Sequence, residues 1–462
     1  MPHEYTGGRG RWDSSAPSRR PGGSLAHQSF PTGVEDGSRM DQTTLENGVR
    51  VLTERIPGVR SVSVGVWIRQ GAAHEPEEAL GASHLLEHLV FKGTENRSPR
   101  EIALALESLG GALDAFTSRE HTSYQARVLD EHLPQALDVL ADVILRPVLR
   151  ASDLELEREV VLEEISTVED TPDDLVFELH GRGLWGSHPY GRSILGTRES
   201  VGAMDVATLR AIHQDRYLAG DLVVAAAGRL EHDEVVGQVA RYFGHLPQGT
   251  SPEVPEVPTF TPNPEERVPR SSAQTHIVAG TVTPPRTDPQ RFPLILLASA
   301  LGGGMSSRLF QRIREELALA YTVYTFQSFY RRAGVSGIYV GTRPEWGGRA
   351  VEAIQEELDR VVREGLPPEE LDAVKSQVKG QVMLSLESTT ARLFRLAGFA
   401  LYGQPYLTLD ELLGRIDEVD PDQVLEVADR FFSPNRQFTL RLGPEASKGG
   451  GGPWGEGPED GE

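Results

Sequence analysis

A proline-rich stretch near the middle of the chain limits what this sequence can fold into. Residues 249–270 contain six prolines, at positions 252, 255, 258, 262, 264 and 269. Proline lacks the amide that helix interiors and central strands need, so we expect a semi-rigid extended linker there. A chain of 462 residues is too long for one hydrophobic core. The linker therefore predicts two domains, at residues 42–248 and 271–445.

The two halves of the sequence resemble each other. Residues 149–157 align with residues 366–374 at an offset of 217, although shared helix patterning could produce the same match. In each half, alternating strands such as 62–68 precede amphipathic helices such as 134–144. This order predicts an α+β fold with two related domains, each a mainly antiparallel sheet with helices packed on one face.

The strongest chemical signal is the pentapeptide His84-Leu-Leu-Glu87-His88 in the first half. Residues four apart are neighbours on a helix, so the two imidazoles can bind one metal ion while Glu87 lies beside the water that the metal would hold. Apolar residues around these side chains make an unpaired histidine or glutamate costly, and a metal would compensate. The alternative is a helix whose histidines and glutamate face solvent.

A catalytic zinc site usually has three protein ligands and an open fourth position, so a third ligand is needed. Glu157 and Glu164 lie two helical turns apart on a later segment with an apolar stripe, where carboxylates need a partner. An ordinary acidic helix face would also explain them. Spacing alone does not separate Glu164 from the neighbouring Glu163.

With these residues the chain resembles the pitrilysin (insulinase, M16) family of zinc metallopeptidases, which includes insulin-degrading enzyme. Its signature is His-x-x-Glu-His followed about 76 residues on by a glutamate, with a second glutamate seven residues before that one. Glu164 and Glu157 stand at these places. The single-chain bacterial members and the beta subunit of the mitochondrial processing peptidase look most similar. Further similar segments occur in order at 44–53, 91–94, 115–124, 191–197 and 304–310.

The resemblance implies a clamshell of two domains that closes around an extended peptide. It implies one Zn²⁺ per chain, held by His84, His88 and Glu164, and a zinc metalloendopeptidase in which Glu87 is the general base for a metal-activated water. Glu157 would orient a metal ligand. The second half lacks the motif, and at the offset of 217 Gln381 stands opposite Glu164, so we expect an inactive repeat.

The resemblance also assigns residues that contact the substrate. Arg314 and Tyr321 match a pair that the family's second domain brings over the active site, whereas without the resemblance they would be a surface charge and a core ring. Segment 113–129 alternates like an edge strand, and the resemblance implies that the substrate backbone adds to it as one more strand, with residues 114–116 contacting the substrate. Asp114 stands where the family usually has Asn, and Ala318 stands where it often has Gly. Ala115 and Phe116 would line the cleft.

Composition excludes several classes of protein. The chain has no cysteine, so disulfides, thiolate ligands and cysteine nucleophiles are excluded. Its formal net charge of −22 makes nucleic acid an unsuitable partner and favours cationic peptides.

No apolar run has membrane length, so we expect no membrane partner and a cytoplasmic protein. The Gly-, Pro- and charge-rich tails at 1–41 and 446–462 predict disorder, and the first also weakly resembles a mitochondrial targeting segment.

We therefore expect an endopeptidase that acts on peptides or unfolded segments. Two alternatives stay open: a processing peptidase that removes N-terminal segments from precursors, and a non-catalytic structural or chaperone-like subunit of the same fold. The complete set of motif residues argues against the second alternative. Members of this length pair as homodimers or with an inactive relative, and the residues do not choose between these.

Overall fold

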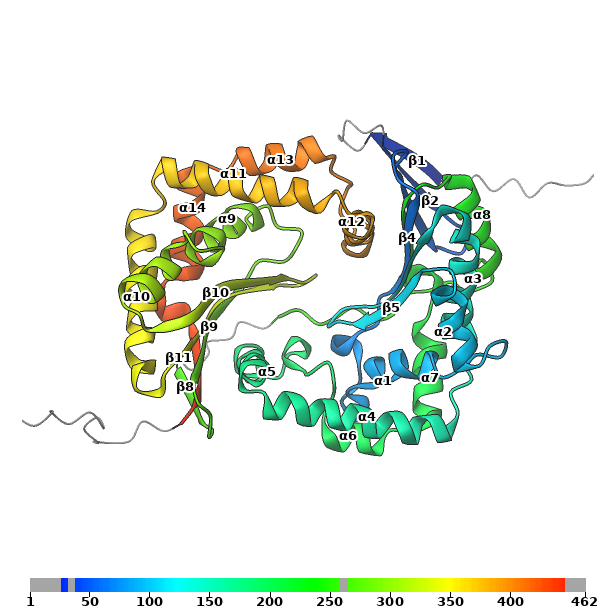
Figure 1. The fold of residues 1–462 in the computed structure, drawn as a ribbon, viewed down its shortest axis with the longest axis horizontal. Helices are drawn as coiled ribbons and strands as arrows, with labels where there is room; N and C mark the ends of the chain where they lie inside the picture. Colours follow the sequence, from blue (N-terminus) through cyan, green and yellow to red (C-terminus); the bar gives the residue numbers. More distant parts are fainter. Residues whose placement is uncertain (1–25, 32–37, 258–264, 445–462) are drawn as a thin grey trace, which may run out of the picture.

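The computed structural model describes residues 26–31, 38–257 and 265–444. Each half of this part of the chain contains one β-sheet and a set of helices, and the two sheets lie on opposite sides of the molecule (Figure 1). This arrangement agrees with the α+β fold of two related domains that the sequence predicts.

The sheet of the first half has the strand order β1-β2-β3-β7-β4-β6-β5. Its neighbours pair antiparallel except β3 and β7, which run parallel. Among the described strands, β5 forms one edge of this sheet and pairs with β6 alone, so its outer backbone groups have no partner strand there. The strands are β1 (Ala26–Pro31), β2 (Arg39–Thr44), β3 (Arg50–Arg55), β4 (Ser61–Ile68), β5 (Ala112–Thr117), β6 (Thr122–Leu129) and β7 (Leu222–Gly228).

The sheet of the second half has the order β10-β11-β9-β12-β8, with a parallel pair between β12 and β8. Its strands are β8 (Glu265–Pro269), β9 (Thr275–Thr283), β10 (Ala320–Phe329), β11 (Gly334–Thr342) and β12 (Phe438–Gly443).

Helices account for most of the remaining described residues. Those before the linker are α1 (Ala82–Val90), α2 (Pro99–Glu107), α3 (Leu133–Leu145), α4 (Ala151–Asp170), α5 (Pro172–Trp185), α6 (Arg198–Ala203), α7 (Val206–Arg216) and α8 (His232–Phe243). Those after it are α9 (Arg291–Gly302), α10 (Gly347–Glu364), α11 (Pro368–Ser385), α12 (Thr389–Tyr402), α13 (Leu409–Asp417) and α14 (Pro421–Val427).

The helices reproduce the offset that the sequence comparison found. α11 begins 217 residues after α4, and α12 begins and ends 217 residues after α5. Two helices in the same order and at the same offset support a duplicated unit.

The halves exchange a helix. α12, from the second half, packs against β3, β4 and β7, where Leu396 is fully buried with Trp67 and Val223. α5, from the first half, packs against β9 and β12, where Val176 and Phe438 share one cluster. In Figure 1, α12 lies beside the first sheet and α5 lies near the second. The two halves are therefore joined by packing as well as by the linker, because each sheet has one face covered by a helix of the other half.

Two expectations about irregular segments need correction. The tail predicted at 1–41 contains β1, which pairs with β2 from Ala26 opposite Thr44 to Pro31 opposite Arg39. The linker predicted at 249–270 contains β8, which pairs with β12 and ends at Pro269. Parallel pairing on the outside of the sheet tolerates proline, because an edge strand needs only half of its amides. Residues 1–25, 258–264 and 446–462 lie outside the described residues. Among the described helices, none combines the length and the apolar character that crossing a bilayer requires.

Candidate metal centre

The helix with the His-x-x-Glu-His motif starts at a fixed place. Gly81, which precedes α1, has a φ of 87°, in the left-handed region that glycine adopts without strain. A Cβ atom there would lie 2.6 Å from the carbonyl oxygen of Leu195. The buried carboxylate of Glu75 accepts hydrogen bonds of 2.7 Å from the amides of Gly81 and Ser83. These contacts satisfy two free amides at the helix N-terminus and fix where the motif begins.

The apolar side of α1 brings it against α4. The buried cluster between them contains Leu85, Leu86 and Leu89 from α1 and Leu154, Val161 and Ile165 from α4. Because Glu164 is adjacent to a buried position of α4, it lies at the contact with α1, whereas Glu163 is exposed. Packing therefore separates the two glutamates that spacing did not.

His84, His88 and Glu164 converge. One ligand atom from each lies within 4.8 Å of the others. The Nε2 atoms of His84 and His88 are 3.7 and 3.8 Å from the two carboxylate oxygens of Glu164. These distances exceed a hydrogen bond, whereas two ligand atoms bound at about 2.1 Å in a tetrahedron lie roughly 3.4 Å apart. The three side chains therefore fit a zinc ion between them.

Burial shifts the pKa values of His84 and Glu87. It lowers the pKa of His84 to about 4, helped by the nearby His88, so His84 is neutral at pH 7 and can act as a metal ligand. Burial also raises the pKa of Glu87, although a hydrogen bond of 2.6 Å from Thr117 Oγ1 to Glu87 Oε2 partly opposes the shift. A carboxylate with a raised pKa is better matched to proton transfer near neutral pH.

Glu157 lies behind one of the two imidazoles. Its Oε2 atom is 3.1 Å from His88 Nδ1, and its Oε1 atom is 2.7 Å from Lys92 Nζ. The contact with His88 leaves Nε2 of that ring free to face Glu164. His84 has no matching support, because its buried Nδ1 atom lacks a hydrogen-bond partner among the described residues.

A groove of about 710 Å³ opens beside Glu87 and His88. Asp114 and Ala115 of β5 line it, together with apolar residues such as Phe91. Phe116 is not one of its lining residues, and the centre of its ring lies 5.9 Å from that of Phe394 in α12. That Phe116 lines the substrate cleft beside Ala115 stays a prediction.

Arg314 and Tyr321 lie together in the second half. The guanidinium of Arg314 is 4.4 Å from the centre of the Tyr321 ring, which is 75% exposed. Within the described residues, neither side chain has a hydrogen bond or ion pair with α1 or α4. Tyr321 is therefore not the core ring that its sequence context favours.

Sequence reasoning missed three supporting residues: Glu75, Lys92 and Thr117. Thr117 was the easiest of the three to predict, because it shares a strand face with Ala115, two positions earlier. Glu75 could not be found from spacing, since its carboxylate reaches the start of α1 across an irregular segment.

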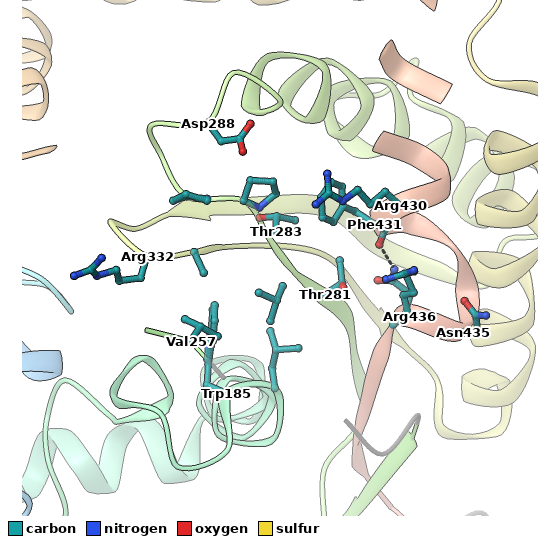
Figure 2. A pocket seen from close by; sticks show the side chains of 16 residues that line it. Trp185, Val257, Thr281, Thr283, Asp288, Arg332, Arg430, Phe431, Asn435 and Arg436 are labelled. Carbon is teal, nitrogen blue, oxygen red and sulfur yellow. Dashed lines mark hydrogen bonds between the residues drawn. The ribbon is translucent and has the colours of Figure 1, made fainter. Parts of the chain in front are cut away.

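A second cavity, of about 510 Å³, lies where α5 meets the second sheet (Figure 2). Trp185 and Thr281 line it, with Arg430 and Arg436 at one end. Its described lining includes Asp288 as the one carboxylate and no histidine, so it offers no second set of metal ligands.

The chain is similar to known proteins over most of its length. The model of insulinase, peptidase family M16, matches residues 50–198, and the model of the peptidase M16 inactive domain matches residues 203–378. A protein of Mycobacterium tuberculosis named an uncharacterized zinc protease is 40% identical over 88% of this chain and 94% of its own. The chain belongs to peptidase family M16.

Further M16 relatives share the same description. An uncharacterized zinc protease of Bacillus subtilis is 39% identical over 86% of this chain and 97% of its own. Among solved structures, a peptidase M16 inactive domain from Pseudomonas fluorescens has a TM-score of 0.83 and 22% identity, covering 89% of this chain and all of that one. A protease from Helicobacter pylori has a TM-score of 0.81 and 20% identity, covering 88% and 99%. The structures support the M16 fold, and the relatives' names indicate a zinc peptidase in general.

Proposed function

We propose that this chain is a zinc-dependent endopeptidase that hydrolyses peptides or unfolded segments. One observation carries the proposal. The convergent donors of His84, His88 and Glu164 lie beside Glu87 at a groove that β5 borders. A single site thus has ligands for a metal, a base and a place for a substrate.

The edge of β5 supports binding of an extended backbone. Its outer amides and carbonyls have no partner strand within the described part of the chain, so a substrate segment can pair with them as one more strand. This mode needs several residues of free backbone, which peptides and unfolded segments offer and folded proteins do not. The net charge of −22 favours cationic peptides. Equal, salt-independent cleavage of matched cationic and anionic peptides would contradict this preference.

When bound, zinc acidifies a water molecule and polarises a peptide carbonyl. The chain's own residues do the rest. His84 binds as a neutral imidazole, and His88 is held by Glu157. Glu87 accepts the proton of the attacking water and passes it to the leaving amine. Because Thr117 occupies Oε2 of Glu87, Oε1 is the oxygen that exchanges protons.

The test compares the wild type with Glu87→Gln. Both proteins are loaded with zinc, their metal content is measured, and cleavage of a quenched unstructured peptide is followed with and without a chelator. We expect both to bind about one zinc per chain and only the wild type to cleave, with cleavage lost on chelation. If neither protein binds zinc or cleaves, the chain is a non-catalytic subunit and the proposal fails.

We also propose that the chain works as a homodimer in which Arg314 and Tyr321 serve the centre of the partner copy. Tyr321 is exposed, and among the described residues neither side chain of the pair has a hydrogen bond or ion pair with α1 or α4. Arg314 would supply positive charge to the oxyanion that forms during peptide hydrolysis. In such a dimer, the second half of the partner copy would bring this pair to the groove.

Complementation tests that arrangement. Glu87→Gln and Arg314→Ala chains are each inactive or weak alone, but a mixed dimer contains one site with both Glu87 and Arg314. Random mixing should then restore about a quarter of wild-type activity, because half of the dimers carry one complete site. A mixture no more active than its components would show that the pair acts within its own chain, or does not act at all. A monomer in light scattering would exclude the dimer.

A further inference from the structure

The hydrogen bond between Thr117 and Glu87 ends a chain of contacts that begins in the second half of the molecule. Thr117 is the last residue of β5, and its hydroxyl lies 2.6 Å from Glu87 Oε2. The position of the hydroxyl depends on how the strand ends. The turn at 118–121, which joins β5 to β6, therefore affects Glu87.

This turn is held on its first-half side by backbone contacts. Its own amide–carbonyl bond runs from Ser118 N to His121 O at 2.8 Å. The amides of Ala72 and Ala73 donate to the carbonyls of Ser118 and Arg119 at 3.1 and 2.8 Å. These contacts define the shape of the turn but leave the side chain of the residue at its tip, Glu120, to be held by something else.

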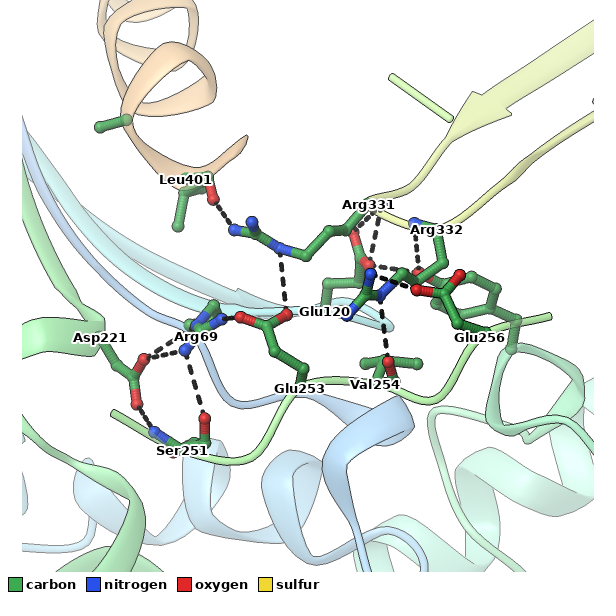
Figure 3. Close-up of polar contacts among 12 residues, drawn as sticks. Arg69, Glu120, Asp221, Ser251, Glu253, Val254, Glu256, Arg331, Arg332 and Leu401 are labelled. Carbon is green, nitrogen blue, oxygen red and sulfur yellow. Dashed lines mark hydrogen bonds and ion pairs between the residues drawn. The ribbon is translucent and has the colours of Figure 1, made fainter. Parts of the chain in front are cut away.

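Glu120 is held by donors from both halves, Tyr190 from the first and the backbone of Arg331 from the second. Its carboxylate is buried and accepts a bifurcated hydrogen bond from the amide of Arg331, which lies 3.0 and 3.1 Å from the two oxygens. The hydroxyl of Tyr190 donates to Glu120 at 2.5 Å and accepts from the amide of Arg332 at 3.2 Å. Arg331 and Arg332 form the tip of the β10–β11 hairpin, which reaches across to the first half (Figure 3).

The side chains of the hairpin tip anchor it in several directions. The guanidinium of Arg331 bonds the carbonyl of Leu401 and lies 3.7 Å from Glu253, which also pairs with Arg69. The guanidinium of Arg332 bonds the carbonyl of Val254, as Figure 3 shows. With its side chains fixed in this way, the tip presents rigid amides to Glu120. A buried carboxylate that lost these donors would be left without most of its hydrogen bonds.

We propose that Glu120 is a positioning residue that couples the docking of the second half, through the 118–121 turn and Thr117, to the orientation of Glu87. The inference rests on the proposed peptidase function, since Glu87 must be its base. The inactive half then does more than enclose substrate, because its hairpin tip sets the geometry of the base in the other half. A base held by a hydrogen-bonded threonine keeps one oxygen aimed at the water.

The first test is a set of variants assayed for kcat, KM and zinc content. Thr117→Val should lower kcat by about 10- to 100-fold, the usual effect of a misplaced catalytic group, with KM and zinc content unchanged. Thr117→Ser keeps the hydroxyl and should restore most of the rate. Glu120→Gln should lower kcat in the same way. Glu231→Gln is the matched control, because Glu231 forms an exposed ion pair with Arg55 that is not part of this chain of contacts, and it should leave kcat unchanged.

The double variant decides whether Glu120 acts through Thr117. If it does, Glu120→Gln should change kcat by less than about twofold when Thr117 is already valine, because the path is broken. Equal factors in both backgrounds would overturn the proposal, as would an unchanged kcat in either single variant. If Glu120→Gln does not fold, Tyr190→Phe replaces it, since it removes one donor to the same carboxylate and should lower kcat by a smaller factor.

A measurement without substrate separates this inference from the peptidase function. Hydrogen exchange of a peptide covering residues 112–122 should be faster in Glu120→Gln than in the wild type and Glu231→Gln. Unchanged exchange would overturn the coupling even if the wild type cleaves peptides. A wild type that cleaves nothing while exchange responds as expected would instead remove the peptidase function, and with it the role of Glu120 in catalysis.

Discussion

His88 and Glu157 lie in contact across two helices, with Nδ1 of the imidazole 3.1 Å from Oε2 of the carboxylate. The other carboxylate oxygen is 2.7 Å from Lys92 Nζ. A carboxylate on Nδ1 keeps that proton in place, so Nε2 presents its lone pair toward Glu164. The side chain of Glu157 is only 8% exposed, and Lys92 balances its charge.

Replacing this carboxylate should weaken metal binding without unfolding the protein. We expect Glu157→Gln to lower zinc affinity by about 10- to 100-fold, the usual effect of losing an outer partner of a metal-bound histidine. Competition with a chromophoric chelator measures the change. Glu155→Gln is the control, because Glu155 is exposed on the same helix. Equal zinc affinities of Glu157→Gln and the control would contradict this role.

The exchanged helix α5 offers a test of how tightly the halves pack. A Cβ at Gly183 would lie 2.4 Å from Cζ of Phe438 in β12, whereas at Gly181 the nearest atom is 3.8 Å away, on Arg119. Gly183→Ala should therefore lower the free energy of unfolding by about 1–3 kcal/mol through overpacking. Gly181→Ala should instead raise it by about 0.5–1 kcal/mol, since alanine favours helix. Chemical denaturation measures both, and a Gly183→Ala variant as stable as Gly181→Ala would contradict the packing.

The contact between the halves should also weaken in acid. Burial lowers the pKa of His180, whose Nε2 lies 3.1 Å from the carbonyl oxygen of Phe438, to about 4. Below about pH 6.5 the unfolded chain binds a proton on this residue that the folded chain does not bind. The contribution of neutral His180 to the free energy of unfolding is therefore complete above pH 6.5 and is lost as the pH falls toward 4.

Unfolding free energies between pH 7 and 4 test this prediction. His180→Gln should flatten the dependence by up to about 1.4 kcal/mol per pH unit, the value for one proton. His245→Gln, at an exposed position, should leave the slope unchanged. If His180→Gln keeps the wild-type slope, the acid sensitivity comes from other groups.

Ala318 has a backbone conformation that favours glycine. Its φ of 50° lies in the left-handed region, which costs a residue with a Cβ atom about 1 kcal/mol. The residue lies between Arg314 and Tyr321, at the place where the family often has glycine. We expect Ala318→Gly to raise the free energy of unfolding by about 0.5–1 kcal/mol, the strain relieved less the entropy of the unfolded chain. A decrease of similar size would show that the strain at this position is not significant.

The sequence predicted the parts of the site that follow from local periodicity. His84, Glu87 and His88 share a helical face because of their spacing alone, and the structure places them so. Spacing did not separate Glu164 from Glu163, and the family resemblance made the choice. Without the resemblance it needs the packing of α4, because adjacent helix positions differ by about 100° and only buried neighbours reveal which one faces inward.

Features that depend on contacts between distant segments were beyond the sequence. The apolar faces of α5 and α12 are visible as patterns, but no local rule says that each covers the sheet of the other half. The same limit explains why segment 113–129 was predicted as one edge strand, whereas it forms β5 and β6 joined by a turn at 118–121. Glu120 went unnoticed because its partner, the amide of Arg331, lies 211 residues away.

The most direct test of the central claim is a zinc titration of the metal-free wild type while peptide cleavage is followed. We predict no cleavage without metal, a rate that rises in proportion to added zinc, and a plateau at one zinc per chain, with His88→Ala showing neither tight binding nor cleavage. Cleavage by the metal-free wild type, or full activity in His88→Ala, would contradict the account.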